Sequence, residues 1–107
     1  MKKTINKLVR DHIPSICKRN GQIPETKVLD GDAYRAALHL KLQEEVGEYL
    51  TDFSIEELAD ILEVVEALAE NQGSSLRDVM ELKQKKQAVN GAFRNRIFLI
   101  GVDEKKQ

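Results

Sequence analysis

The residues with the clearest chemical potential are carboxylates that recur at helical spacing in two neighbouring segments, 43–48 and 56–63. Residues three or four apart lie on one face of a helix, so each segment gathers its carboxylates on one side. A short connection near 51–54 predicts that the two helices are antiparallel neighbours, which lets both sets converge. The residues concerned are Glu44, Glu45 and Glu48 in the first segment, and Glu57 and Asp60 in the second.

Glu45 is the most informative of these residues because its position predicts burial. At about 100° per residue, Glu45 falls inside the apolar stripe that contains Leu38 and Leu42. Glu57 falls beside Ile61 on an apolar face of the second helix. A carboxylate without a partner is costly on an apolar face, so these two residues call for a compensating group.

Clustered carboxylates repel each other, by about 4 kcal/mol for a pair roughly 4 Å apart at an effective dielectric constant near 20. The repulsion is relieved either by protonation or by a bound cation. Oxygen ligands without Cys or His suit Mg²⁺ or Mn²⁺, and Mg²⁺ commonly binds substrate phosphates as well. Glu-rich helices also occur simply as solvated surfaces, and the residues alone leave that alternative open.

The elements that must position these carboxylates are helices. Low aromatic content and the absence of Trp favour packing of aliphatic helices. We expect an all-α, antiparallel helical bundle with a short extended C-terminal segment. The segment from Arg94 to Val102 is either a short strand or an apolar arm, which periodicity does not separate. The expected helices are a short one between Pro14 and Asn20-Gly21, a long one capped by Asp32 and ending near Thr51, one from Ser54 to about Asn71, and one from Leu76 to about Val89.

The length of 107 residues predicts a single domain, 1–107. The net charge of −1 hides an asymmetry, because ten acidic and no basic residues lie between Leu42 and Leu76. No basic face is interleaved with aromatic residues, which argues against a nucleic-acid partner.

The lone Cys17 allows neither an internal disulfide nor a Cys-based metal cage. The basic N-terminus lacks the apolar region of a signal peptide and no run is long enough to span a bilayer, so we expect a cytoplasmic protein without a membrane partner.

The motifs EEVGE (44–48) and EELAD (56–60) resemble the EExxE…ExxD signature of the MazG-like all-α nucleoside triphosphate pyrophosphohydrolases. Eight residues separate Glu48 from Glu57, fewer than in typical members. The resemblance covers nearly the whole chain and is most specific to the phosphoribosyl-ATP pyrophosphohydrolase-like, or house-cleaning, subgroup. It is carried by NKLVRDHIP (6–14), LQEEVGEYL (42–50), EELADILEVVEAL (56–68) and NGAFRNRIFL (90–99), in that order.

This resemblance implies a Mg²⁺-dependent hydrolase that converts a nucleoside triphosphate, standard or modified, to the monophosphate and pyrophosphate. It implies that Glu45, Glu48, Glu57 and Asp60 are the Mg²⁺ ligands, with Mn²⁺ as an alternative ion. It further implies that Glu44 is the catalytic residue that orients or deprotonates the attacking water, or else a further ligand.

Basic residues outside the acidic segments are candidates to bind the phosphates of such a substrate, because a metal neutralises only part of a triphosphate. Their alternative role is that of a solvated surface. The candidates are Lys7 and Arg10 near the start, Lys83 and Lys86 on the last helix, and Arg94 and Arg96 near the end.

The segment 56–70 carries apolar residues on more than one face, including Leu58 and Leu62 on one and Ile61 and Val64 on another. A single partner helix covers only one stripe. We therefore expect a homodimer or a dimer of dimers, which the resemblance also implies. The alternative function is a non-catalytic helical dimer module that binds another protein.

Overall fold

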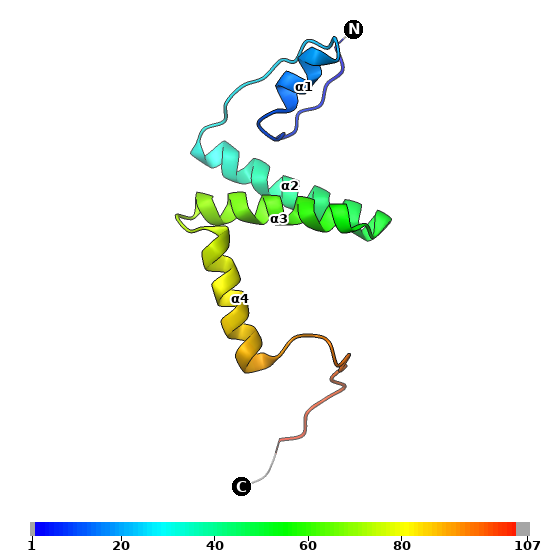
Figure 1. The fold of residues 1–107 in the computed structure, drawn as a ribbon, viewed down its shortest axis with the longest axis vertical. Coiled ribbons are helices and arrows are strands. Elements are labelled where there is room, and N and C mark those ends of the chain that lie inside the picture. Colours follow the sequence, from blue (N-terminus) through cyan, green and yellow to red (C-terminus); the bar gives the residue numbers. More distant parts are fainter. Residues whose placement is uncertain (1, 105–107) are drawn as a thin grey trace. The chain divides into compact units, whose positions relative to one another are not determined.

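The structure, a computed structural model, describes residues 2–104 and contains four helices. The helices are α1 (Ile13–Arg19), α2 (Gly31–Asp52), α3 (Ile55–Asn71) and α4 (Leu76–Asn90), as Figure 1 shows. No strand occurs within residues 2–104, so the strand alternative for the segment after α4 is wrong. The predicted all-α class is therefore confirmed. The segment after α4 contains a turn, in which the N–H of Arg96 donates to the carbonyl of Phe93, and the apolar side chains of 97–100 are exposed.

The chain divides into two compact units, Met1–Leu76 and Arg77–Gln107. The first unit contains α1, α2 and α3, and the second contains almost all of α4 and the segment that follows it. The single domain expected from chain length stays a prediction, and each unit is described by itself below.

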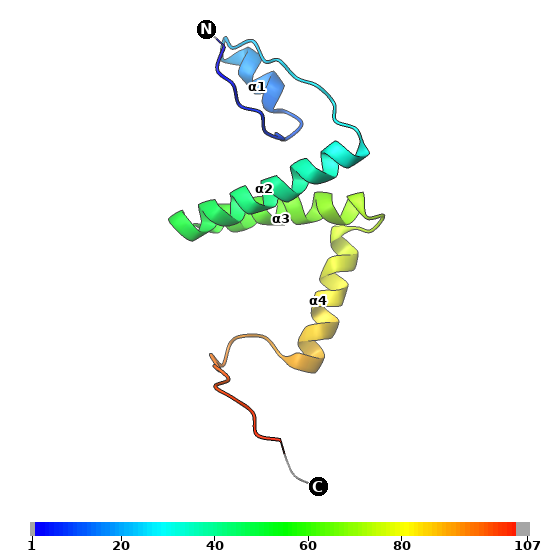
Figure 2. The same ribbon diagram turned by 180° about the vertical axis from the view of Figure 1, so that it is seen from behind.

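Helices α2 and α3 form an antiparallel hairpin and lie side by side in both Figure 1 and Figure 2. Phe53 ends α2 in the left-handed conformation, with φ 56°, and its N–H donates to the carbonyl of Tyr49. The hydroxyl of Ser54 then accepts a hydrogen bond from the backbone N–H of Glu57 at 3.2 Å, which confirms the predicted cap of α3. The buried apolar side chains of the hairpin include Leu38 and Val64.

The start of α2 differs from the prediction, because the cap is Asp30 and not Asp32. The carboxylate of Asp30 accepts a hydrogen bond from the backbone N–H of Ala33 at 2.9 Å, and the backbone of Asp30 is extended, as a capping residue requires. Asp32 lies instead in the first turn, where its negative charge is favoured by the helix dipole.

The remaining helix ends agree with the sequence. Pro14 lies in the first turn of α1, and Gly21 follows that helix with φ 80°. Gly91 follows α4 with φ 86°, a conformation that glycine adopts without strain. None of the helices within residues 2–104 has the length and apolar character required to cross a membrane.

Candidate cation site

Three carboxylates from the two helices of the hairpin meet at one point. Glu45 of α2, Glu57 of α3 and Asp60 of α3 each offer an oxygen atom, and these oxygens lie within 4.8 Å of one another. Glu45 is only 7% exposed, whereas Glu57 and Asp60 are half-buried. The hairpin thus brings together three of the four residues that the resemblance implies as metal ligands.

Two oxygen atoms of this cluster lack hydrogen-bond partners among the described residues. They are Oε2 of Glu45 and Oε2 of Glu57, and both are buried. A buried acceptor without a donor is costly, and nearly all such atoms in folded proteins have a partner. A cation coordinated by these two oxygens would supply the favourable interaction that no described protein group provides.

Burial also changes the acidity of the cluster. It raises the pKa of Glu45, and the neighbouring Glu48 carboxylate raises it further. Burial and the same Glu48 carboxylate raise the pKa of Glu57 from its ordinary value of 4.5 to about 7. At neutral pH the cluster therefore resists full ionisation, and a bound cation would reverse that tendency.

Glu48 itself is exposed and lies outside the group of three converging carboxylates. It is close enough to affect the pKa values of Glu45 and Glu57. Its role as a fourth ligand stays a prediction.

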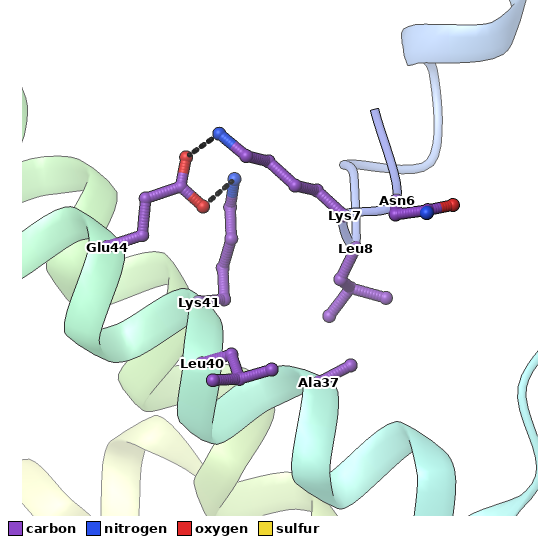
Figure 3. Close-up of a pocket in the computed structure, with 7 residues that line it drawn as sticks. All are labelled: Asn6, Lys7, Leu8, Ala37, Leu40, Lys41 and Glu44. Carbon is purple, nitrogen blue, oxygen red and sulfur yellow. Dashed lines mark hydrogen bonds and ion pairs between the residues drawn. The ribbon is translucent and has the colours of Figure 1, made fainter. Parts of the chain in front are cut away.

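Glu44, on the same helix as Glu45, is bound by two lysines. The Nζ atom of Lys7 donates to Oε1 of Glu44 at 3.0 Å, and the Nζ atom of Lys41 lies 3.5 Å from Oε2. Figure 3 shows both lysine side chains pointing at this carboxylate. The bond from Lys7 lowers the pKa of Glu44 and raises that of Lys7, so Glu44 is ionised at neutral pH.

Arg10 forms the second ion pair between the N-terminal segment and the hairpin. Its Nη2 atom donates to Oδ1 of Asp60 at 2.7 Å, across 50 positions of sequence. Lys7 and Arg10, which the sequence suggests as phosphate-binding residues, therefore neutralise carboxylates at the candidate site. Next to this pair is a cavity of about 250 Å³, lined by Val9, Arg10, Ile13, Lys41, Glu45 and Asp60.

Lys41 is a residue of the site that the sequence analysis missed. Its Nζ atom lies 3.5 Å from Oε1 of Glu45 as well as 3.5 Å from Oε2 of Glu44, and its side chain is only 22% exposed. The spacing was visible in the sequence, because residues three and four positions apart form ion pairs on a helix. Lys41 also lines a second cavity, of about 190 Å³, together with Asn6, Lys7, Leu8, Ala37, Leu40 and Glu44 (Figure 3).

The other predicted phosphate-binding residues belong to the second unit. Lys83 and Lys86 lie on α4, and Arg94 and Arg96 lie in the segment after it. All four are exposed. Their role in binding phosphate stays a prediction.

Comparisons with known proteins add little to this geometry. No family model and no solved structure matches the chain. A protein of Mycolicibacterium smegmatis, described as uncharacterized, is 49% identical over 41 residues, which is 38% of this chain. The matched part spans 42% of the length of that protein, whose description names no activity.

Proposed function

We propose that the chain is a MazG-like, Mg²⁺-dependent nucleoside triphosphate pyrophosphohydrolase. The observation that carries the proposal is the convergence of Glu45, Glu57 and Asp60 within 4.8 Å, with two buried carboxylate oxygens that accept no hydrogen bond from the described residues. The order of the four family-like motifs supports the same assignment. The ligand is a nucleotide rather than a nucleic acid, and we place the activity in the cytoplasm.

The chemistry of the donors fits the proposed ion. The converging atoms are all carboxylate oxygens, which suit Mg²⁺ and also Mn²⁺. Glu45, Glu57 and Asp60 would hold the ion, and Glu48 would complete the set. Bound there, the ion would supply electrostatic stabilisation of negative charge on the phosphate oxygens.

The proposed reaction is hydrolysis of the bond between the α- and β-phosphates. The oxygen of a water molecule forms a bond to phosphorus, the bridging P–O bond breaks, and the products are the nucleoside monophosphate and pyrophosphate. Glu44 would orient this water by accepting a hydrogen bond from it. The lowered pKa of Glu44 favours orientation over proton abstraction, because a more acidic carboxyl group is a weaker base.

Cationic side chains would offset the charge of the leaving pyrophosphate. Lys7 and Arg10 already lie beside Glu44 and Asp60, at 3.0 and 2.7 Å. The exposed cations of the second unit would contribute further positive charge. These are Lys83, Lys86, Arg94 and Arg96.

The proposed assembly is a homodimer or a dimer of dimers. Ile55, Leu58 and Leu62 follow one another at helical spacing along α3, and all three side chains are exposed in the single chain. Such a stripe is costly in water and suits a second copy of the hairpin.

The direct test is an assay of the purified protein with Mg²⁺ against a panel of standard and modified nucleoside triphosphates, with product analysis. We expect a monophosphate and pyrophosphate. A nucleoside diphosphate and orthophosphate as products would contradict the proposed bond cleavage.

The exposed stripe of α3 also suits a second candidate function, that of a non-catalytic helical dimer module that binds another protein. Inactivity across the whole panel, with a folded protein, would favour that candidate.

A further inference from the structure

Lys41 lines both of the cavities described above, the one beside Arg10 and Asp60 and the one beside Lys7 and Glu44. Its side chain is 22% exposed, whereas those of Lys7 and Arg10 are 54% and 56% exposed. Lys41 is therefore the most enclosed cation beside the carboxylates, and it is carried by the same helix as Glu45.

The partners of Lys41 are shared with other positive groups. Glu44 is also bound by Lys7 at 3.0 Å, so Lys41 is not the only cation that neutralises it. Glu45 has Lys41 within 3.5 Å of Oε1, while its buried Oε2 atom has no hydrogen-bond partner among the described residues. A divalent cation at Glu45 would satisfy this oxygen and compete with Lys41 for the same carboxylate.

We infer that Lys41 is a phosphate-binding residue, and that its ammonium group passes from Glu45 to a phosphate of the ligand when a divalent cation takes Glu45. This inference rests on the proposed function and deepens it. It places a phosphate group of the ligand beside Lys41, the residue that lines both cavities. It also assigns an order, in which the cation binds first and the phosphate second.

The inference predicts effects of opposite sign on two kinds of binding. Without phosphate, the positive charge of Lys41 opposes the cation, so its removal strengthens cation binding. With phosphate, Lys41 donates a charge-assisted hydrogen bond, so its removal weakens binding of the anion. A residue with a merely structural role would weaken both.

The experiment is calorimetry on the full chain with two probes, Mg²⁺ alone and inorganic pyrophosphate in the presence of Mg²⁺. Pyrophosphate is the proposed product and is not consumed. The variants are Lys41→Gln, Lys41→Arg and Arg35→Gln, the last being the matched control because Arg35 is an exposed cation of the same helix. Circular dichroism monitors folding, and Lys41→Arg keeps the charge if Lys41→Gln does not fold.

For Lys41→Gln we expect Mg²⁺ alone to bind about fivefold more tightly, because a nearby positive charge is removed. We expect pyrophosphate to bind about tenfold more weakly, as for the loss of one hydrogen bond to a charged group. Lys41→Arg should retain most of the pyrophosphate affinity, and Arg35→Gln should change neither affinity by more than about twofold.

Unchanged or stronger pyrophosphate binding in Lys41→Gln, with cation binding intact, would overturn this inference and leave the proposed function standing. Weaker binding of both probes would show a structural role and would also overturn it. A wild-type protein that binds no Mg²⁺ would overturn the inference together with the proposed function.

Discussion

The helical hairpin of the first unit and helix α4 of the second carry their charges in different environments. In the hairpin, Glu45 is buried, and the pKa of Glu57 is raised to about 7. On α4, Arg77 and Glu81 form an ion pair at 3.3 Å with both side chains exposed, a type of contact that contributes about 0.3–0.5 kcal/mol. No residue of α4 is buried. Enclosure between two packed helices thus raises the pKa values of Glu45 and Glu57 and sets this cluster apart from an exposed ion pair on a single helix.

The largest effect that this contrast predicts is on turnover. Glu57→Gln should lower kcat by about 100-fold or more, because an amide cannot supply the charge that the proposed ion needs. Steady-state kinetics on the nucleotide that the panel identifies provides the measurement. Glu63→Gln is the control, because Glu63 is an exposed carboxylate of the same helix and should leave kcat near the wild-type value. Equal loss of kcat in both variants would remove the distinction between the carboxylates of the cluster and the exposed carboxylates of the same helix.

The second effect concerns assembly. Replacing Leu58 and Leu62 with Glu should dissociate the proposed oligomer, because burial of each leucine contributes about 1.5–3 kcal/mol and a buried charge adds a further cost. Light scattering should then report the 12.2 kDa chain. Leu82→Glu, at an exposed position of α4, should leave the mass unchanged. A wild-type protein that is already monomeric at micromolar concentration would contradict the proposed role of the α3 stripe.

The third effect is stabilisation by the ion. Mg²⁺ at about 100 times its dissociation constant should stabilise the folded protein by about 2.7 kcal/mol. For a chain of this size that corresponds to a rise in Tm of roughly 10 °C, measurable by thermal scans. Glu45→Gln should abolish the rise, and without Mg²⁺ it should be at least as stable as the wild type, because it removes a buried charge. A rise that persists in Glu45→Gln would place the ion elsewhere.

A smaller effect is expected from the second unit. Lys86→Gln should raise KM a few-fold and change kcat little, because an exposed lysine would contribute to binding rather than to the chemical step. Initial rates over a range of substrate concentrations separate the two constants. A fall in kcat as large as that of Glu57→Gln would mean that the two units contribute equally to the chemistry.

The smallest effect is a dependence of stability on pH in the absence of a divalent cation. Between the ordinary pKa of 4.5 and the folded-state value of about 7, the folded protein binds more protons at Glu57 than the unfolded chain does. The free energy of unfolding should therefore fall as pH rises through this window. The lowered pKa of Glu44 acts in the opposite direction, but only below its ordinary value of 4.5. Chemical denaturation at several pH values checks this, and Glu57→Gln should flatten the slope.

Much of the hairpin could be predicted from the sequence because its signals are local. The capping by Ser54 and the burial of Glu45 both follow from spacing along one helix. The cap of α2 shows the limit of such signals, because the sequence predicted Asp32 and the structure has Asp30. Either aspartate is a suitable capping residue, and only the backbone conformation determines which of them caps the helix.

The parts that could not be predicted depend on tertiary structure. The bond between Arg10 and Asp60 joins residues 50 positions apart, and no periodicity specifies it. Helical spacing places Glu45 on the apolar stripe, but it does not show that the oxygens of Glu57 and Asp60, from the next helix, reach Glu45 while the exposed Glu48 lies outside this group. The ion pairs of Lys41 could be predicted from helical spacing, but the two cavities that it lines could not.

The connection between α2 and α3 has a consequence for how the cluster is encoded. Only Phe53 and Ser54 separate the helices, and Phe53 holds a left-handed φ of 56° that is uncommon for a residue with a side chain. One inserted residue continuing the helix would rotate α3 by about 100° about its own axis. Glu57 and Asp60 would then turn away from Glu45, although all three carboxylates would still be present in the chain. The length of the connection therefore determines which faces of α2 and α3 meet. The cluster depends on this length as much as on its acidic residues.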